Sequence, residues 1–115
     1  MRGIALFAMA ATVKTRRETL EEFLAADPND SFSRYALALE LDKADSRVNA
    51  AAELREVLAR DPGYVAAYYH LGRILSRLGE PEEARAVYTR GLEAAATAKD
   101  QRALSEIQEA LDMLD

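Results

Sequence analysis

The stretch DPGYVAAYYHLGRILSRLGEPEEARAVYTRGL, residues 61–92, has an earlier counterpart in DPNDSFSRYALALELDKADSRVNAAAELREVL, residues 27–58. The two stretches match at a distance of thirty-four positions, the difference between residue 61 and residue 27. The matching residues, in pairs, are Asp27-Pro28 and Asp61-Pro62, Leu37-Ala38 and Leu71-Gly72, Ala50 and Ala84, Leu54 and Tyr88, and Leu58 and Leu92. A fixed period of this size is typical of solenoid proteins, which stack one supersecondary unit per repeat.

The composition favours helix and excludes several classes of function. Half of the 115 residues are apolar, and there are only five glycines and three prolines. The formal net charge of −5 argues against non-specific nucleic-acid binding, which needs a basic face. The absence of cysteine excludes disulfides, thiolate metal sites and thiol nucleophiles. We therefore expect one all-α domain, with no cofactor and a cytoplasmic location.

Periodicity and punctuation predict six helices joined by short connections. Their expected ranges are about 15–26, 31–43, 47–60, 64–78, a fifth that begins at Pro81, and 100–114. Asp30 or Ser31 is expected to cap the second helix, and Gly79 is expected to end the fourth in a left-handed conformation. Because short connections make neighbouring helices antiparallel, the chain is predicted to form three successive helical hairpins.

Residues 1–14 form an apolar extension ahead of the repeats. A signal-type cleavage site at Ala8-Met9-Ala10 would leave a hydrophobic region shorter than the about 7–15 residues that export signals need. The extension is also shorter than the roughly 20 residues of a membrane span. We expect a short helix or a non-native start rather than a signal peptide, and the single domain is expected to cover residues 15–115.

The repeated unit resembles the tetratricopeptide repeat signature. The second unit reads Tyr68-x2-Leu71-Gly72-x2-Leu75 and then Ala84-x3-Tyr88, and the first reads Arg34-x2-Leu37-Ala38-x2-Leu41 and then Ala50-x3-Leu54. The resemblance implies an α-solenoid with repeats at about 31–64 and 65–98. It also implies that the small residues Ala38 and Gly72 allow close helix contact, and that the leucines and Tyr88 fill the space between helices.

Two positions depart from the family pattern. Arg34 occupies a position where the family often has Trp, and Ala96 replaces the proline that would close the second repeat. Regular repetition is therefore expected to end after the fifth helix. The first helix is expected to act as a half-repeat, with Leu20, Phe23 and Leu24 in the register of Leu54, Val57 and Leu58. The last helix is expected to act as a cap, with Glu106, Glu109 and Asp112 on its solvated face.

In this family the first helix of each repeat lines a concave groove that receives a partner peptide or helix. By register, the resemblance nominates Phe32, Tyr35, Leu39, Asp42 and Lys43 from the first repeat, and Ala66, Tyr69, Arg73, Ser76 and Arg77 from the second. Lys43, Arg73 and Arg77 would form a basic strip beside Tyr35 and Tyr69. One hypothesis is that the strip receives an acidic or C-terminal carboxylate segment. The alternative is that the arginines pair with nearby carboxylates and bind nothing.

The resulting functional prediction is a non-enzymatic scaffold that binds a protein or peptide partner in its groove. His70 is the single histidine, and no sequence motif ties a nucleophile or carboxylate to it, so an enzyme is not expected. An alternative is a structural homo-oligomer, assembled through the N-terminal extension or through the end helices. The sequence does not identify the partner.

Overall fold

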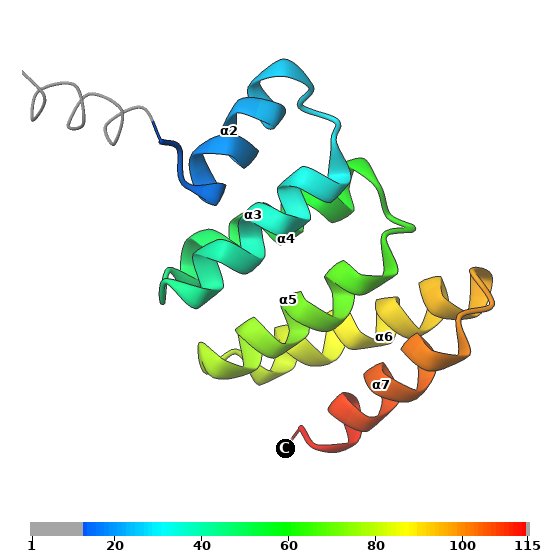
Figure 1. Ribbon diagram of the computed structural model, residues 1–115. Coiled ribbons are helices and arrows are strands. Elements are labelled where there is room, and N and C mark those ends of the chain that lie inside the picture. Colours follow the sequence, from blue (N-terminus) through cyan, green and yellow to red (C-terminus); the bar gives the residue numbers. More distant parts are fainter. Residues whose placement is uncertain (1–12, 115) are drawn as a thin grey trace, which may run out of the picture.

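The computed structural model describes residues 13–114, which form helices and no strands. The helices are α2 (Arg16–Ala26), α3 (Ser31–Lys43), α4 (Arg47–Arg60), α5 (Val65–Arg77), α6 (Pro81–Thr97) and α7 (Gln101–Asp112). In Figure 1 the hairpin of α3 and α4 lies beside the hairpin of α5 and α6, and α7 follows at the end. The predicted all-α solenoid is confirmed, and the six helices lie within a few residues of their predicted ranges.

Local hydrogen bonds explain where several helices begin and end. Thr15 and Glu18 form a reciprocal capping box at the start of α2. The Asp30 carboxylate accepts a hydrogen bond from the Ser33 N–H at 3.0 Å, so Asp30 is the cap expected for α3. Pro81 occupies the first turn of α6, and Gly79 ends the preceding turn with φ of +78°. The predictions for Asp30, Gly79 and Pro81 are confirmed.

The core is one continuous layer between successive helices. Each described helix packs against its neighbours in sequence, and α5 also packs against α7. The leucines that the repeat pattern placed between helices are buried, as are Ala50, Ala84, Tyr68 and Tyr88. Because these small and large side chains alternate between facing helices, the hairpins approach closely and bury their apolar faces.

Each repeat contains an equivalent hydrogen bond that the sequence does not suggest. The Tyr68 hydroxyl donates to the Pro62 carbonyl oxygen at 2.6 Å. At the equivalent position of the first repeat, the Arg34 guanidinium donates to the Pro28 carbonyl oxygen at 3.0 Å. In both repeats a long side chain of the first helix ties down the loop that precedes it. Arg34 also bonds Glu53 of α4 at 3.2 Å, which joins the two helices of its hairpin.

Replacing Tyr68 by phenylalanine is expected to lower the free energy of unfolding by about 1 kcal/mol. The change removes only the hydroxyl, so the Pro62 carbonyl loses its donor while the buried ring remains. Urea unfolding followed by circular dichroism measures the loss. Tyr64→Phe is the control, since no hydrogen bond of the Tyr64 hydroxyl is found within residues 13–114. Equal stability of the Tyr68 variant and the wild type would contradict the role of the bond.

One core prediction is wrong. Phe23 was expected to be buried like Val57, but 52% of its surface is exposed, while Leu20 is buried and Leu24 is partly buried. The equivalent residue of the next repeat, Gly91, faces Tyr68 of its own hairpin. In a complete hairpin, the residue at this position of the second helix therefore packs on the first helix of the same hairpin. Because no helix precedes α2 within residues 13–114, Phe23 has no such surface to cover it.

The predictions for the N-terminal extension fall almost wholly outside the described residues. Of residues 1–14, only Val13 and Lys14 are described, and Lys14 pairs with Glu22 at 2.6 Å. The division into residues 1–14 and 15–115 therefore stays a prediction. Among the described helices, none has the length and apolar character to cross a membrane.

Candidate partner-binding groove

The first helices of the two hairpins, α3 and α5, line one face of the molecule together with the last helix, α7. Two cavities lie along this face. The arginine cavity, of about 350 Å³, is lined by Tyr69, Arg73, Ser76, Arg77, Tyr88, Glu106, Glu109, Ala110, Met113 and Leu114. The tyrosine cavity, of about 300 Å³, is lined by Tyr35, Val65, Ala66, Tyr69, His70, Asp100, Arg102, Ala103, Glu106 and Ile107. Because they share Tyr69 and Glu106, the two cavities form one groove along α5.

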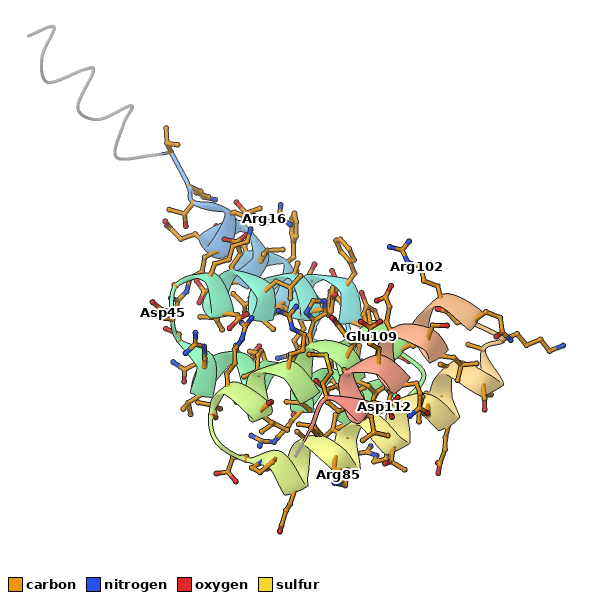
Figure 2. All side chains as sticks on the ribbon, turned by 90° about the horizontal axis from the view of Figure 1, so that it is seen from below. Arg16, Asp45, Arg85, Arg102, Glu109 and Asp112 are labelled. Carbon is orange, nitrogen blue, oxygen red and sulfur yellow. The ribbon has the colours of Figure 1, made fainter. Side chains whose placement is uncertain are left out.

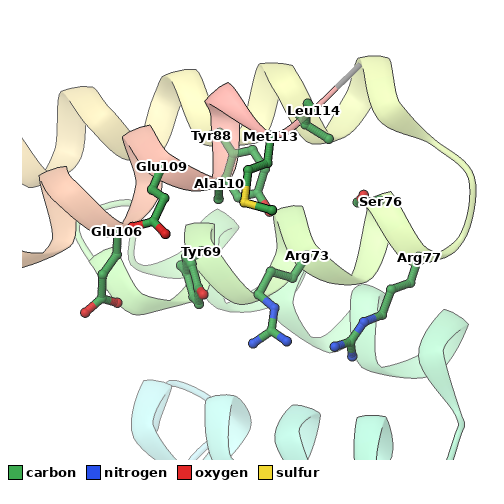
Figure 3. A pocket seen from close by; sticks show the side chains of 10 residues that line it. All are labelled: Tyr69, Arg73, Ser76, Arg77, Tyr88, Glu106, Glu109, Ala110, Met113 and Leu114. Carbon is green, nitrogen blue, oxygen red and sulfur yellow. The ribbon is translucent and has the colours of Figure 1, made fainter.

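The arginine cavity has a basic wall and an acidic wall. Figure 3 shows Arg73 and Arg77 extending from α5, with Glu106 and Glu109 on α7 and Met113 at the end of that helix. Tyr88 of α6 closes the back of the cavity, where its ring is buried. The cavity therefore combines apolar surface with charges of both signs, which suits a polar segment better than a purely apolar one.

The two arginines of this wall differ in their partners. The Arg77 guanidinium lies 3.8 Å from the Asp42 carboxylate of α3, so part of its charge is already balanced. The Arg73 guanidinium lies over the Tyr69 ring, 5.6 Å from its centre. Within residues 13–114, Arg73 has no carboxylate at ion-pair distance. Arg73 is therefore available to an acidic ligand and is held in place by the ring beneath it.

The tyrosine cavity is walled by aromatic rings and carboxylates. The His70 ring contacts the rings of Tyr35 and Tyr69 edge-on, with 5.4 Å between centres in each case. Burial lowers the pKa of His70 below its usual value, and the neighbouring Arg73 lowers it further, while the carboxylates of Asp42 and Glu106 oppose this shift. Among the described residues, no three His, Asp or Glu side chains are grouped as metal ligands.

The residues nominated from the first repeat lie mostly in a third hollow. This hollow, between α2 and α3, has a volume of about 400 Å³ and is lined by Arg16, Phe32, Tyr35, Ala36, Leu39, Glu40 and Lys43. Tyr35 also lines the tyrosine cavity, so it connects the hollow to the groove. Lys43 lines this hollow and not the arginine cavity, and it lies 3.6 Å from the Glu40 carboxylate. The expected basic strip is thus divided between two cavities.

The contribution of α7 to the groove was missed by the sequence reasoning. Glu106 and Glu109 were assigned to a solvated face, and both are exposed, but they also line the arginine cavity. A longer repeat period between α5 and α7 would have placed both glutamates in the groove. Ile107 and Leu111 follow Leu71 and Leu75 by thirty-six positions rather than thirty-four. With that period, the groove positions Arg73 and Arg77 correspond to Glu109 and Met113.

Comparison with known proteins gives consistent matches over most of the chain. The family profile described as "Tetratricopeptide repeat" matches residues 41–111. The TPR repeat-containing protein PA0015 of Pseudomonas aeruginosa is 32% identical over 98 residues, which cover 85% of this chain and 93% of that protein.

Two solved structures are similar in fold and sequence. A tetratricopeptide repeat domain protein from Salinibacter ruber has a TM-score of 0.69 and 43% identity over 71% of this chain and 92% of that chain. Protein BPP2914 from Bordetella parapertussis has a TM-score of 0.74 and 30% identity over 87% of each chain.

Proposed function

This chain belongs to the tetratricopeptide repeat family, and on that premise we propose that it is a non-enzymatic scaffold whose groove binds an acidic segment of a partner protein. Tetratricopeptide repeats use their concave surfaces to bind other proteins. The groove of α3, α5 and α7 is the surface of this kind among the described residues. Its arginine cavity receives a carboxylate of the partner, from an Asp or Glu side chain or from a C-terminus.

The observation that carries the proposal is the state of Arg73. Its guanidinium faces the groove, rests on the Tyr69 ring and has no ion-pair partner within residues 13–114. Arg77 lies one turn away on the same helix face, so a carboxylate between the two would accept hydrogen bonds from both. Tyr and Arg side chains are also the types that most often dominate the energy of protein interfaces.

The facing carboxylates limit which segment fits. Glu106 and Glu109 line the cavity opposite the arginines. A continuous run of acidic residues would approach these glutamates and be repelled. The preferred segment therefore brings one acidic group to the arginine wall, with neutral or basic residues beside it.

Selection from a library of random peptides tests the proposal. We expect the wild-type protein to enrich peptides that share an acidic position. The Arg73→Glu, Arg77→Glu double variant is expected to bind the enriched peptides about thirtyfold more weakly, which corresponds to the loss of an interface contact of about 2 kcal/mol. Isothermal titration of the synthetic peptides measures the change, and circular dichroism checks that the variant remains helical.

The matched control is the Arg17→Glu, Arg85→Glu double variant. It changes the net charge by the same amount, but neither residue lines the arginine cavity or the tyrosine cavity. We expect this control to bind the peptides like the wild type. Equal weakening in both double variants would mean that only overall charge matters, and unchanged binding in the groove variant would place the site elsewhere.

A further inference from the structure

The tyrosine cavity adjoins the arginine cavity, but its lining favours a ligand of the opposite charge. Three aromatic rings, from Tyr35, Tyr69 and His70, come together where Asp100 and Glu106 also line the wall. We propose that this cavity binds a cationic side chain, arginine or lysine, of the same partner segment. The inference rests on the proposed function and adds a basic residue to the acidic one.

The rings supply surfaces to which a cation is attracted. The face of an aromatic ring carries negative charge density, and a guanidinium or ammonium within about 6 Å of its centre is stabilised. The His70 ring contacts the rings of Tyr35 and Tyr69 edge-on, so the three rings line the cavity together, and the Tyr69 ring already holds one guanidinium, that of Arg73. Burial lowers the pKa of His70 and so favours the uncharged imidazole, which does not repel an entering cation.

The carboxylates supply net negative charge at the same place. The Asp100 carboxylate is fixed by a hydrogen bond from the Ala103 N–H at 3.0 Å, where it caps α7. The Glu106 carboxylate accepts a hydrogen bond from Arg102 at 2.9 Å, but the Arg102 side chain is 90% exposed. Figure 2 shows Arg102 extending outward from the start of α7. Since an exposed pair of this kind contributes little energy, a partner cation can replace Arg102 at Glu106.

The position of the two cavities along α5 predicts the spacing of charges in the partner. The tyrosine cavity is centred on Ala66, Tyr69 and His70, and the arginine cavity on Arg73 and Arg77. About seven residues separate the two centres, which corresponds to about 10 Å along a helix. A basic and an acidic side chain would therefore be about three residues apart in an extended segment, or about seven apart in a helical one.

The cation site is tested with a probe that does not depend on any peptide. N-acetyl-arginine amide is titrated into the ¹⁵N-labelled full chain, and the backbone amide signals of Ala66, His70 and Ala103 are followed by NMR. We expect these signals to shift in the wild type. The Asp100→Asn, Glu106→Gln double variant is expected to bind the probe about tenfold more weakly, since it loses both charges beside the rings. Asparagine caps helices as well as aspartate, so α7 is retained.

Two controls separate the site from general charge effects. Glu109→Gln removes a carboxylate from α7 that lines the arginine cavity and not the tyrosine cavity, so it is expected to bind the probe like the wild type. N-acetyl-citrulline amide has the same shape as the probe without its charge, and it is expected to leave the three signals in place. Equal binding of both probes, or no shift with the arginine probe, would overturn the inference.

The probe and the peptide selection can fail independently. If selected peptides depend on Arg73 and Arg77 but the arginine probe does not bind, the cation site is wrong and the proposed function stands. If the probe binds as expected but no peptide is selected, the cation site is supported and the proposed function is overturned.

Discussion

Replacing Leu54 by alanine is expected to lower the free energy of unfolding by about 2–5 kcal/mol. Leu54 is among the largest fully buried side chains, and it lies in α4, which packs against both α3 and α5. The surrounding helices cannot close over the lost atoms without moving a hairpin, so a cavity remains. The total stability of a domain of this size is about 5–15 kcal/mol, so the substitution is expected to remove a large share of it. Urea unfolding followed by helical ellipticity measures the loss.

Val48→Ala is the control for this prediction, since it truncates an apolar side chain on the same helix. Val48 is 69% exposed. We expect its replacement to change the free energy of unfolding by no more than about 0.5 kcal/mol. Since alanine is the better helix former at both positions, a similar loss in both variants would contradict the role of Leu54 in core packing.

The local signals of the sequence predicted most of the fold. The Asp-Pro pairs end the preceding helices, and Asp30 begins α3, because these effects act between residues a few positions apart. The bounds of α3 (Ser31–Lys43) and α4 (Arg47–Arg60) are those that the sequence predicted. Helix pairing followed from the short connections, which leave no other arrangement of neighbours.

The groove wall formed by α7 was not predictable from the thirty-four-residue period. Where Pro62 follows α4, Ala96 continues α6, and α6 has 17 residues against 14 for α4. The longer helix delays the start of α7 and moves its groove positions. The replacement of this proline by Ala96 therefore determines which glutamates of α7 face the arginines. How much longer α6 becomes depends on packing outside the repeat.

The ion pairs of the groove also could not be predicted from the sequence. Sequence spacing predicts pairs within one helix, such as Arg60 with Glu56, which lie 2.6 Å apart. It does not predict the pair of Arg77 with Asp42, which joins two hairpins. Arg73 and Arg77 look alike in the sequence, yet only one of them is paired within the described residues, because pairing depends on which helix end faces which.

The two repeats fill the space between their helices in different ways. The first repeat has Ala38 and Leu54, both buried, where the second repeat has Gly72 and Tyr88 at the equivalent positions. A Cβ atom added at Gly72 would lie 2.2 Å from a carbon of the Tyr88 ring. The ring is buried where it borders the arginine cavity, so an added Cβ atom would have to push it out of its packed position. The large Tyr88 side chain on α6 therefore requires a residue without a side chain at position 72 of α5.

Gly72→Ala is accordingly expected to destabilise the protein although alanine is the better helix former. The gain in helix propensity is about 1 kcal/mol, and overpacking of a core costs about 1–3 kcal/mol. With ring carbons this close, we expect the upper part of that range and a net loss of about 2 kcal/mol. Urea unfolding measures it, and Gly63→Ala is the control, since a Cβ there meets only the Asp61 carboxylate at an ordinary 3.8 Å.

The same substitution is expected to become favourable once Tyr88 is replaced by leucine. The Tyr88→Leu variant loses buried ring atoms and is less stable than the wild type, but it removes Cε1 and Cζ, the two ring atoms nearest to a Cβ atom at position 72. Adding Gly72→Ala then rebuilds the Ala38–Leu54 pair of the first repeat, and the double variant should be about 1 kcal/mol more stable than Tyr88→Leu alone. The effect of Gly72→Ala thus changes sign with the residue at position 88, which a double-mutant cycle detects directly. An equal loss in both backgrounds would show that the ring is not what excludes a side chain from position 72.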